Sequence, residues 1–221
     1  MPTVPAAPGI APLGTYGPLN PDAASSLDGA AAPAPLVTRL TVRDRALDVL
    51  EGQRASVTGT LRAGRALTPL AGRMVSLQAF AGGRWSTMAG TRTGRKGNFA
   101  LRFSPRRIGS ELVRVRYAGE PGARPSRRLL GRLNVYRSVQ VSWYGGGGSL
   151  ACGGALESNT MGVASRTLPC GTLVTLRLGG RSVRVPVIDR GPYVEGREFD
   201  LTEATKDALG FGDTGVVWST S

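Results

Sequence analysis

The middle of the chain, residues 36–137, alternates hydrophobic and polar positions over many short stretches. Phe99, Leu101 and Phe103 are spaced two residues apart, and the same period continues over residues 113–117. A period of two predicts strands that bury one face, and segments that recur about every 8–12 residues favour a β-sandwich. The predicted strands span residues 37–42, 55–62, 74–80, 84–91, 98–103, 112–117 and 133–136.

The last part of the chain, residues 138–221, predicts a second β-structure. Two alternating stretches, residues 173–178 and 182–188, flank Gly179-Gly180, which is typical of a hairpin turn. A further strand is predicted at residues 214–219. Six or so short strands favour a closed barrel, because closure removes the unpaired edges of a sheet.

One helix is predicted in the whole chain, over residues 202–209. Thr202 is a favourable N-cap and Gly210 a favourable C-terminal stop. The fold class is therefore all-β: a barrel over residues 138–221, preceded by a sandwich over residues 36–137.

The first 35 residues differ from the rest in composition. They are rich in Ala, Pro and Gly and lack the apolar residues that a core needs, so we expect a disordered linker. They show neither a basic segment nor a continuous apolar segment of a signal peptide, which places such a signal upstream or indicates a trimmed product. The sequence contains no run of 18 apolar residues, so no transmembrane helix is predicted.

Positive charge is concentrated in the middle of the chain. The net charge is +13, and residues 36–140 carry 21 basic and 5 acidic residues, whereas residues 141–221 carry 7 basic and 8 acidic ones. Such a field attracts nucleic acid, anionic lipid or an acidic polymer. A solvated basic surface in an Arg-rich protein is the alternative. No helix-turn-helix, zinc-finger spacing or aromatic platform indicates nucleic-acid binding.

Cysteine and histidine usage narrows the chemistry. The two cysteines, Cys152 and Cys170, predict one disulfide and an oxidising compartment, with two buried free thiols as the alternative. The chain has no histidine, which excludes a Ser-His-Asp triad and a histidine-built zinc site. We expect no metal and no cofactor.

The strongest catalytic candidate is Asp189, which directly follows an apolar β-branched run and precedes Arg190-Gly191-Pro192. The pattern predicts a carboxylate held where a strand leaves the sheet. Asp189 either acts as an acid there or caps the turn.

Four ordered motifs carry a family resemblance over residues 139–221. They are Ser-Trp-Tyr-Gly at 142–145, Leu-Ala-Cys-Gly-Gly at 150–154, Arg-Thr-Leu-Pro-Cys-Gly-Thr at 166–172 and Asp-Arg-Gly-Pro-Tyr at 189–193. In this order and spacing they resemble the six-stranded double-psi β-barrel of the rare lipoprotein A family. The preceding segment resembles bacterial immunoglobulin-like modules. The resemblance implies an exported or wall-associated protein that acts on peptidoglycan glycan strands, often as a lytic transglycosylase. In that setting anionic wall polymers are the expected counterparts of the basic residues 36–137. We also expect a monomer.

The resemblance assigns the catalytic role to Asp189. A lytic transglycosylase needs one carboxyl group, because the 6-hydroxyl of the sugar attacks its own anomeric carbon; ordinary hydrolysis normally needs two. The Arg190 side chain should then point away from Asp189 or towards Asp200 or Glu198. Predicted substrate-binding residues are Tyr144, Ser165, Thr167, Arg190, Tyr193 and Asp200. Second carboxylate candidates are Asp200, Glu198, Glu195 and Glu157.

Two departures from the family pattern leave a second interpretation open. Ser165 stands where active members usually carry histidine, and Ala155 where they tend to carry glutamate. The alternative is a non-catalytic, expansin-like module that binds glycan in the same groove; a secreted inhibitor barrel is a third. Among the aromatic residues we expect Trp143 to be buried and Tyr144 and Tyr193 to be exposed.

Overall fold

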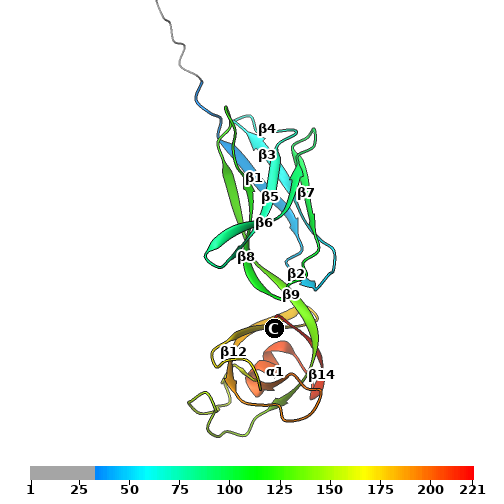
Figure 1. Ribbon diagram of the computed structural model, residues 1–221, viewed down its shortest axis with the longest axis vertical. Helices are drawn as coiled ribbons and strands as arrows, with labels where there is room; N and C mark the ends of the chain where they lie inside the picture. The colour runs from blue at the N-terminus through cyan, green and yellow to red at the C-terminus, as the bar shows by residue number, and fades with distance from the viewer. Residues whose placement is uncertain (1–32) are drawn as a thin grey trace, which may run out of the picture. The chain divides into compact units, whose positions relative to one another are not determined.

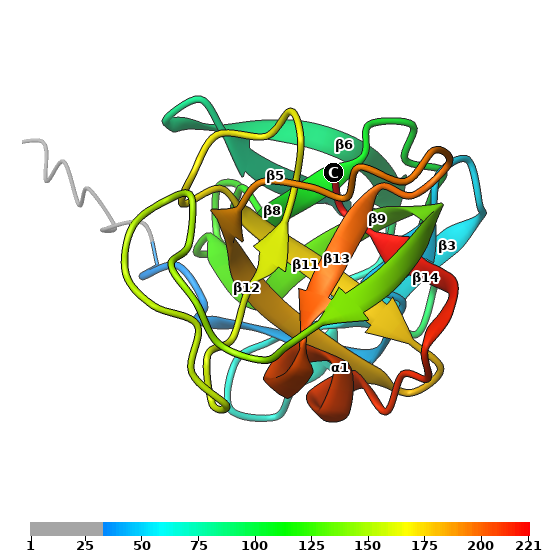
Figure 2. The same cartoon turned by 90° about the horizontal axis from the view of Figure 1, so that it is seen from below.

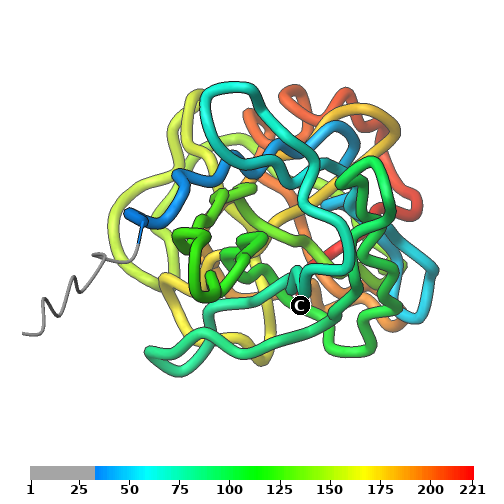
Figure 3. Tube along the Cα trace, turned by 90° about the horizontal axis from the view of Figure 1, so that it is seen from above, coloured from blue at the N-terminus to red at the C-terminus, as the bar shows by residue number. Residues whose placement is uncertain are grey.

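A computed structural model describes residues 33–221 of the chain (Figures 1 and 3). The predicted linker lies almost wholly in residues 1–32, outside the described residues. Apart from one short helix, the described chain is built of strands and their connections. The all-β prediction is confirmed.

The first group of strands forms two sheets that face each other. One sheet contains β1 (Thr38–Arg45), β3 (Ala55–Ala63), β4 (Thr68–Pro69) and β7 (Asn98–Phe103). The other contains β5 (Met74–Ala81), β6 (Arg84–Arg92), β8 (Gly109–Tyr117) and β9 (Ser126–Tyr144), with the short β2 (Asp48–Leu50) paired to β9.

The two sheets enclose one hydrophobic cluster. Val57 and Leu101 from the first sheet meet Leu77 and Val115 from the second, and all four side chains are fully buried. Every second residue of these strands faces the cluster, as the period-two pattern predicts. A sandwich is therefore present, while its assignment to the immunoglobulin-like modules and the domain boundaries stay predictions.

Strand β9 belongs to both halves of the described chain. Its first part pairs with β8, from Ser126 to Val135, and its last part pairs with β14, from Arg137 to Ser142. The strand continues without a break for 19 residues (Figure 1). The predicted strand at residues 133–136 is thus a small part of a much longer one.

Six strands close into a barrel around a second hydrophobic cluster. The additional strands are β10 (Val163–Ala164), β11 (Leu173–Leu178), β12 (Arg181–Asp189), β13 (Phe199–Thr202) and β14 (Thr214–Ser219). Their pairing follows the order β9, β14, β11, β12, β10 and β13, and β13 pairs in parallel with β9 to complete the circle. Figure 2 shows this ring of strands with helix α1 beside it.

Helix α1 (Glu203–Leu209) follows β13 directly. Thr202 is its N-cap, accepting from the Thr205 amide, and Gly210 ends it in the left-handed conformation with φ 66°. Both capping predictions are confirmed. Leu209 and Thr205 are buried, so this face of the helix packs on the barrel.

Candidate active site

Asp189 is the last residue of β12, where the sequence pattern places it. Its Oδ1 accepts two backbone hydrogen bonds, from the Ala151 amide at 2.9 Å and the Arg190 amide at 2.8 Å. Its own carbonyl accepts from the Ser165 amide at 3.1 Å. The carboxylate is half-buried and held by backbone groups of two separate segments, which restricts it to one orientation.

Tyr144, the last residue of β9, lies beside this carboxylate. Its side chain is half-buried, and its hydroxyl oxygen is buried without meeting hydrogen-bond geometry to any described residue. Burial, then the negative charge of Asp189 and a weak hydrogen-bonding interaction with it, and last the charge of Asp200, raise the pKa of Tyr144. The hydroxyl therefore stays protonated at neutral pH and is available as a donor. The expectation of an exposed Tyr144 is wrong for its polar end.

Asp200 lies on β13, close to the same place. Strand register pairs Ala164 of β10 with Asp189 on one side and with Asp200 on the other. The Asp200 carboxylate accepts from the Ser142 hydroxyl, which also accepts from Nη1 of Arg197 at 3.0 Å. Two carboxylates and one tyrosine hydroxyl thus come together from β12, β13 and β9.

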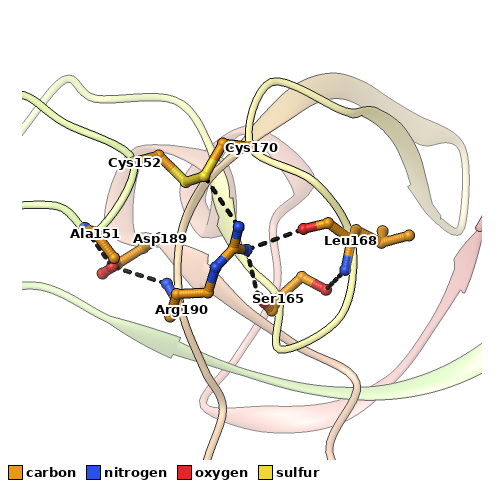
Figure 4. The surroundings of a disulfide bond; sticks show 7 residues. All are labelled: Ala151, Cys152, Ser165, Leu168, Cys170, Asp189 and Arg190. Atoms are coloured by element: carbon orange, nitrogen blue, oxygen red, sulfur yellow. Dashed lines mark hydrogen bonds between the residues drawn. A yellow bond between two sulfur atoms is a disulfide. The ribbon is translucent and has the colours of Figure 1, made fainter.

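Arg190 is turned away from the Asp189 carboxylate, as the transglycosylase interpretation requires (Figure 4). Its Nη1 donates to the carbonyls of Ser165 and Leu168, both at 2.9 Å, and its Nη2 contacts the sulfur of Cys170 at 3.0 Å. It contacts neither Asp200 nor Glu198. Through these contacts Arg190 holds the 165–170 segment in place.

The predicted disulfide joins Cys152 to Cys170, across 18 residues of sequence. Cys152 directly follows Ala151, whose amide holds Asp189, and Cys170 is in contact with Arg190 (Figure 4). The disulfide therefore ties together the two segments that surround the Asp189 carboxylate.

The other predicted binding residues differ in accessibility. Ser165 is 2% exposed and its hydroxyl accepts from the Leu168 amide, which leaves it little surface to offer a sugar. Thr167 is exposed, and Tyr193 is 83% exposed, as expected for a residue that could stack on a sugar. Trp143 was expected to be buried but is only half-buried, with Lys206 4.2 Å from its ring centroid.

Three further carboxylates were candidates from the sequence. Glu198 bonds Arg137 at 2.7 Å, and Glu195 is exposed. Glu157 lines a cavity of about 260 Å³ together with the glycines that follow Tyr144 and with Glu203. Glu203, the first residue of α1, was not among the carboxylates singled out from the sequence.

Within residues 33–221, no group of three or more His, Cys, Asp or Glu side chains is arranged to hold a metal ion. No helix among these residues is long and apolar enough to span a membrane. The chemistry available at the barrel mouth is that of carboxyl groups, a phenol and backbone amides.

The fold and the site define a class of protein domain. Residues 137–218 match the family model of the double-psi β-barrel described as "Lytic transglycolase". The matched residues begin within β9 and include residues of all six barrel strands, so this part of the chain is similar to an RlpA-like double-psi β-barrel domain.

Curated relatives agree with this assignment. The probable endolytic peptidoglycan transglycosylase RlpA of Aquifex aeolicus (strain VF5) is 43% identical over 82 residues, which cover 35% of this chain and 36% of the relative. The protein of the same name from Synechocystis sp. is 41% identical over 122 residues, covering 48% of this chain and 38% of the relative. The chain spans little more than a third of the length of these two relatives.

A solved structure, the Streptomyces papain inhibitor (SPI), aligns with 38% of this chain and 91% of its own, at 22% identity and a TM-score of 0.31.

Proposed function

We propose that this protein cleaves the glycan strands of peptidoglycan by a lytic transglycosylase reaction, with Asp189 as the general acid and base. The observation that carries the proposal is the Asp189 carboxylate, fixed by two amides at the barrel mouth beside the buried Tyr144 hydroxyl. The names of the relatives, endolytic peptidoglycan transglycosylases, support the substrate class.

The proposed reaction needs no second nucleophile. Both amides bind Oδ1, so Oδ2 is the oxygen left to carry a proton. Protonated Asp189 donates to the glycosidic oxygen, and the bond from that oxygen to the anomeric carbon breaks. The 6-hydroxyl of the same sugar attacks the anomeric carbon and returns its proton to the Asp189 carboxylate. The products are a 1,6-anhydro sugar end and a free 4-hydroxyl, and no water is consumed.

The neighbouring groups support this role in two ways. The Arg190 guanidinium donates to carbonyls of the 165–170 segment, so it does not pair with the Asp189 carboxylate. Tyr144 presents a protonated hydroxyl that can donate to Asp189 or to a sugar hydroxyl, and Tyr193 presents an exposed ring for stacking. The departures at Ser165 and Ala155 mean that Asp189 must work without the histidine and glutamate of active relatives.

The same proposal includes an extracytoplasmic location. A disulfide persists in oxidising compartments, and peptidoglycan lies outside the cytoplasmic membrane. A monomeric state is part of the proposal.

The test is incubation of the purified chain with glycan strands stripped of stem peptides, followed by mass spectrometry. Wild-type protein should yield 1,6-anhydro ends, and Asp189→Asn should lose at least 100-fold in rate, the order expected for removal of a general acid. Asp207→Asn is a matched control, because this exposed carboxylate lies on α1 and has only Lys206 as an ion-pair partner, at 3.5 Å.

Reducing ends that incorporate labelled water would contradict the transglycosylase and indicate hydrolysis. If wild type and Asp189→Asn both bind to the cell wall and neither yields a product, catalysis is contradicted. The protein would then be a non-catalytic glycan-binding module.

A further inference from the structure

The outward face of the second sheet of the sandwich carries an unusual set of side chains. Val113, Val115 and Tyr117 of β8 are buried, so the alternate residues Arg114 and Arg116 point away from the core. We call the set formed by these two arginines, the cross-strand Arg127 of β9, Trp85 and Gln78 the arginine face.

Arg114 is fixed in this face by two neighbours. Its guanidinium carbon lies 4.0 Å from the ring centroid of Trp85, and its Nε donates to Oε1 of Gln78 at 2.9 Å. Trp85 packs on Phe80 with ring centroids 5.2 Å apart. A stacked guanidinium with Nε engaged keeps its two terminal nitrogens as a preorganised fork, the geometry that binds a phosphate through two parallel hydrogen bonds.

The remaining arginines add charge that nothing on the face offsets. Arg116 and Arg127 lie directly opposite each other on β8 and β9, a like-charge pair that destabilises a sheet. Burial, with the positive charges of Arg127 and Arg116, lowers the pKa of Arg114, as expected where cations converge. None of the ion pairs found in residues 33–221 involves these three arginines.

The acidic residues of the sandwich lie elsewhere. Glu120 pairs with Arg73 at 2.9 Å, Asp44 accepts from Thr58 in the other sheet, and Asp48 accepts from Asn134 and Tyr136. Glu111 shares the side of β8 that holds Val113 and Val115, opposite to the arginines.

We propose that the arginine face binds a linear phosphodiester polymer with a polyol backbone, as found among anionic wall polymers. Arg116 and Arg127 face each other across β8 and β9, and Arg114 follows two residues away on the same side of β8, so the three fit successive phosphates of one chain better than a single small anion. Trp85 is occupied by Arg114 and Phe80, so the ring supports the arginine and is not free for base stacking, which nucleic-acid binders use. This binding site is separate from the barrel and does not depend on the proposed glycan cleavage.

The test measures binding of the purified chain to poly(glycerol phosphate) by titration calorimetry at several salt concentrations. The triple variant Arg114→Gln/Arg116→Gln/Arg127→Gln should weaken binding at least tenfold. It should lower the slope of log K against log salt by about two to three, since each phosphate contact contributes about 0.7–0.9. The variant with lysine at the same three positions keeps the charge. Its affinity should lie between those of wild type and the triple glutamine variant, because lysine lacks the planar fork.

A matched control removes three charges from the other sheet. Arg39, Arg43 and Arg45 are exposed on β1 and engage in no ion pair in the described part of the chain, so their triple glutamine variant has the same net charge. It should retain most of the affinity. Equal losses in both triple variants would overturn the proposal in favour of non-specific attraction.

The choice of polymer separates the remaining outcomes. Equal binding of poly-L-glutamate of matched charge would contradict phosphate recognition, and tighter binding of oligo-dT would reassign the face to nucleic acid. Binding only to phosphatidylglycerol vesicles would reassign it to a membrane surface.

Asp189→Asn should bind the polymer like wild type, so failure of polymer binding and failure of catalysis are distinguishable. Because Arg114 stacks on Trp85, the double variant Arg116→Gln/Arg127→Gln tests the proposal with this contact intact.

Discussion

Asp189 depends on main-chain groups for its orientation, and Tyr144 places beside it a buried hydroxyl that makes no well-formed hydrogen bond to the described residues. A buried hydroxyl without a partner costs free energy in the folded protein, about 1–3 kcal/mol when it is fully desolvated. A protein retains such a group where the hydroxyl forms a hydrogen bond with a ligand. The Tyr144 hydroxyl is therefore expected to matter for turnover and to contribute nothing favourable to stability at neutral pH.

Tyr144→Phe should separate these two properties. We expect the rate of anhydro-product formation to fall about tenfold, because one hydrogen bond worth about 1.4 kcal/mol in the transition state is lost. The free energy of unfolding at pH 7, measured by urea denaturation, should stay unchanged or rise. A clear loss of stability would show that the hydroxyl is already satisfied in the folded protein.

The same variant should change stability in alkali. The pKa of Tyr144 is raised above its ordinary value of 10.0 in the folded protein, so the folded state keeps this proton to higher pH than the unfolded chain. Ionisation of Tyr144 therefore leaves the free energy of unfolding unchanged below the ordinary pKa of 10.0 and lowers it as the pH rises further. The free energy of unfolding of wild type should therefore fall above about pH 10, and that of Tyr144→Phe should fall less steeply. Equal slopes would contradict the raised pKa.

The sequence predicted Asp189 and its strand end because both depend on a contiguous motif. It did not predict the surroundings of Tyr144, since these arise where β9 pairs in parallel with β13, some sixty residues later in the chain. Nor did it predict that Arg190 would bind backbone carbonyls of the 165–170 segment, because a carbonyl acceptor has no signature in the sequence.

At the scale of elements, strands bounded by strong turn signals were predicted well. β7, β11 and β14 begin and end where the alternation does, whereas β10 and β13 were missed. These two are short, and each is a strand only because distant segments pair with it on both sides. Val163 of β10 and Leu201 of β13 are fully buried, but segments of two and four residues are too short to establish a period.

The junction between β13 and α1 offers a test at this scale. Thr202 is fully buried; its hydroxyl accepts from the Gly162 amide at 3.2 Å and lies 2.9 Å from the Thr205 hydroxyl, in addition to capping α1. Thr202→Ala should lower the free energy of unfolding by about 2 kcal/mol, through the lost cap and the buried groups left unpaired. Thr202→Ser keeps the hydroxyl and should lose less. Equal losses would assign the effect to the methyl group.

At the scale of the whole molecule, the disulfide connects stability with the site. Closing a loop of about 18 residues stabilises a fold by roughly 3 kcal/mol on the chain-entropy model. The free energy of unfolding of Cys152→Ser/Cys170→Ser, measured by urea denaturation, should therefore be lower by this amount. Its rate of product formation should also fall, because the Ala151 amide is held less firmly.

Wild-type protein treated with a reductant should behave like this double variant, and the reductant should leave the double variant unchanged. An active and equally stable double variant would show that Arg190 and the backbone hydrogen bonds hold the site without the sulfur bridge.

Strand β9 has a consequence for how the RlpA-like domain can be recombined with other proteins. The family match begins at residue 137, inside a strand whose preceding residues pair with β8 and whose following residues pair with β14 and β13. A gene fusion cut at that residue would give the barrel a free strand end where the native protein has continuous backbone. Any graft of this barrel onto a new carrier must therefore supply a strand that leads into residue 137, because a flexible tether would not reproduce the native junction.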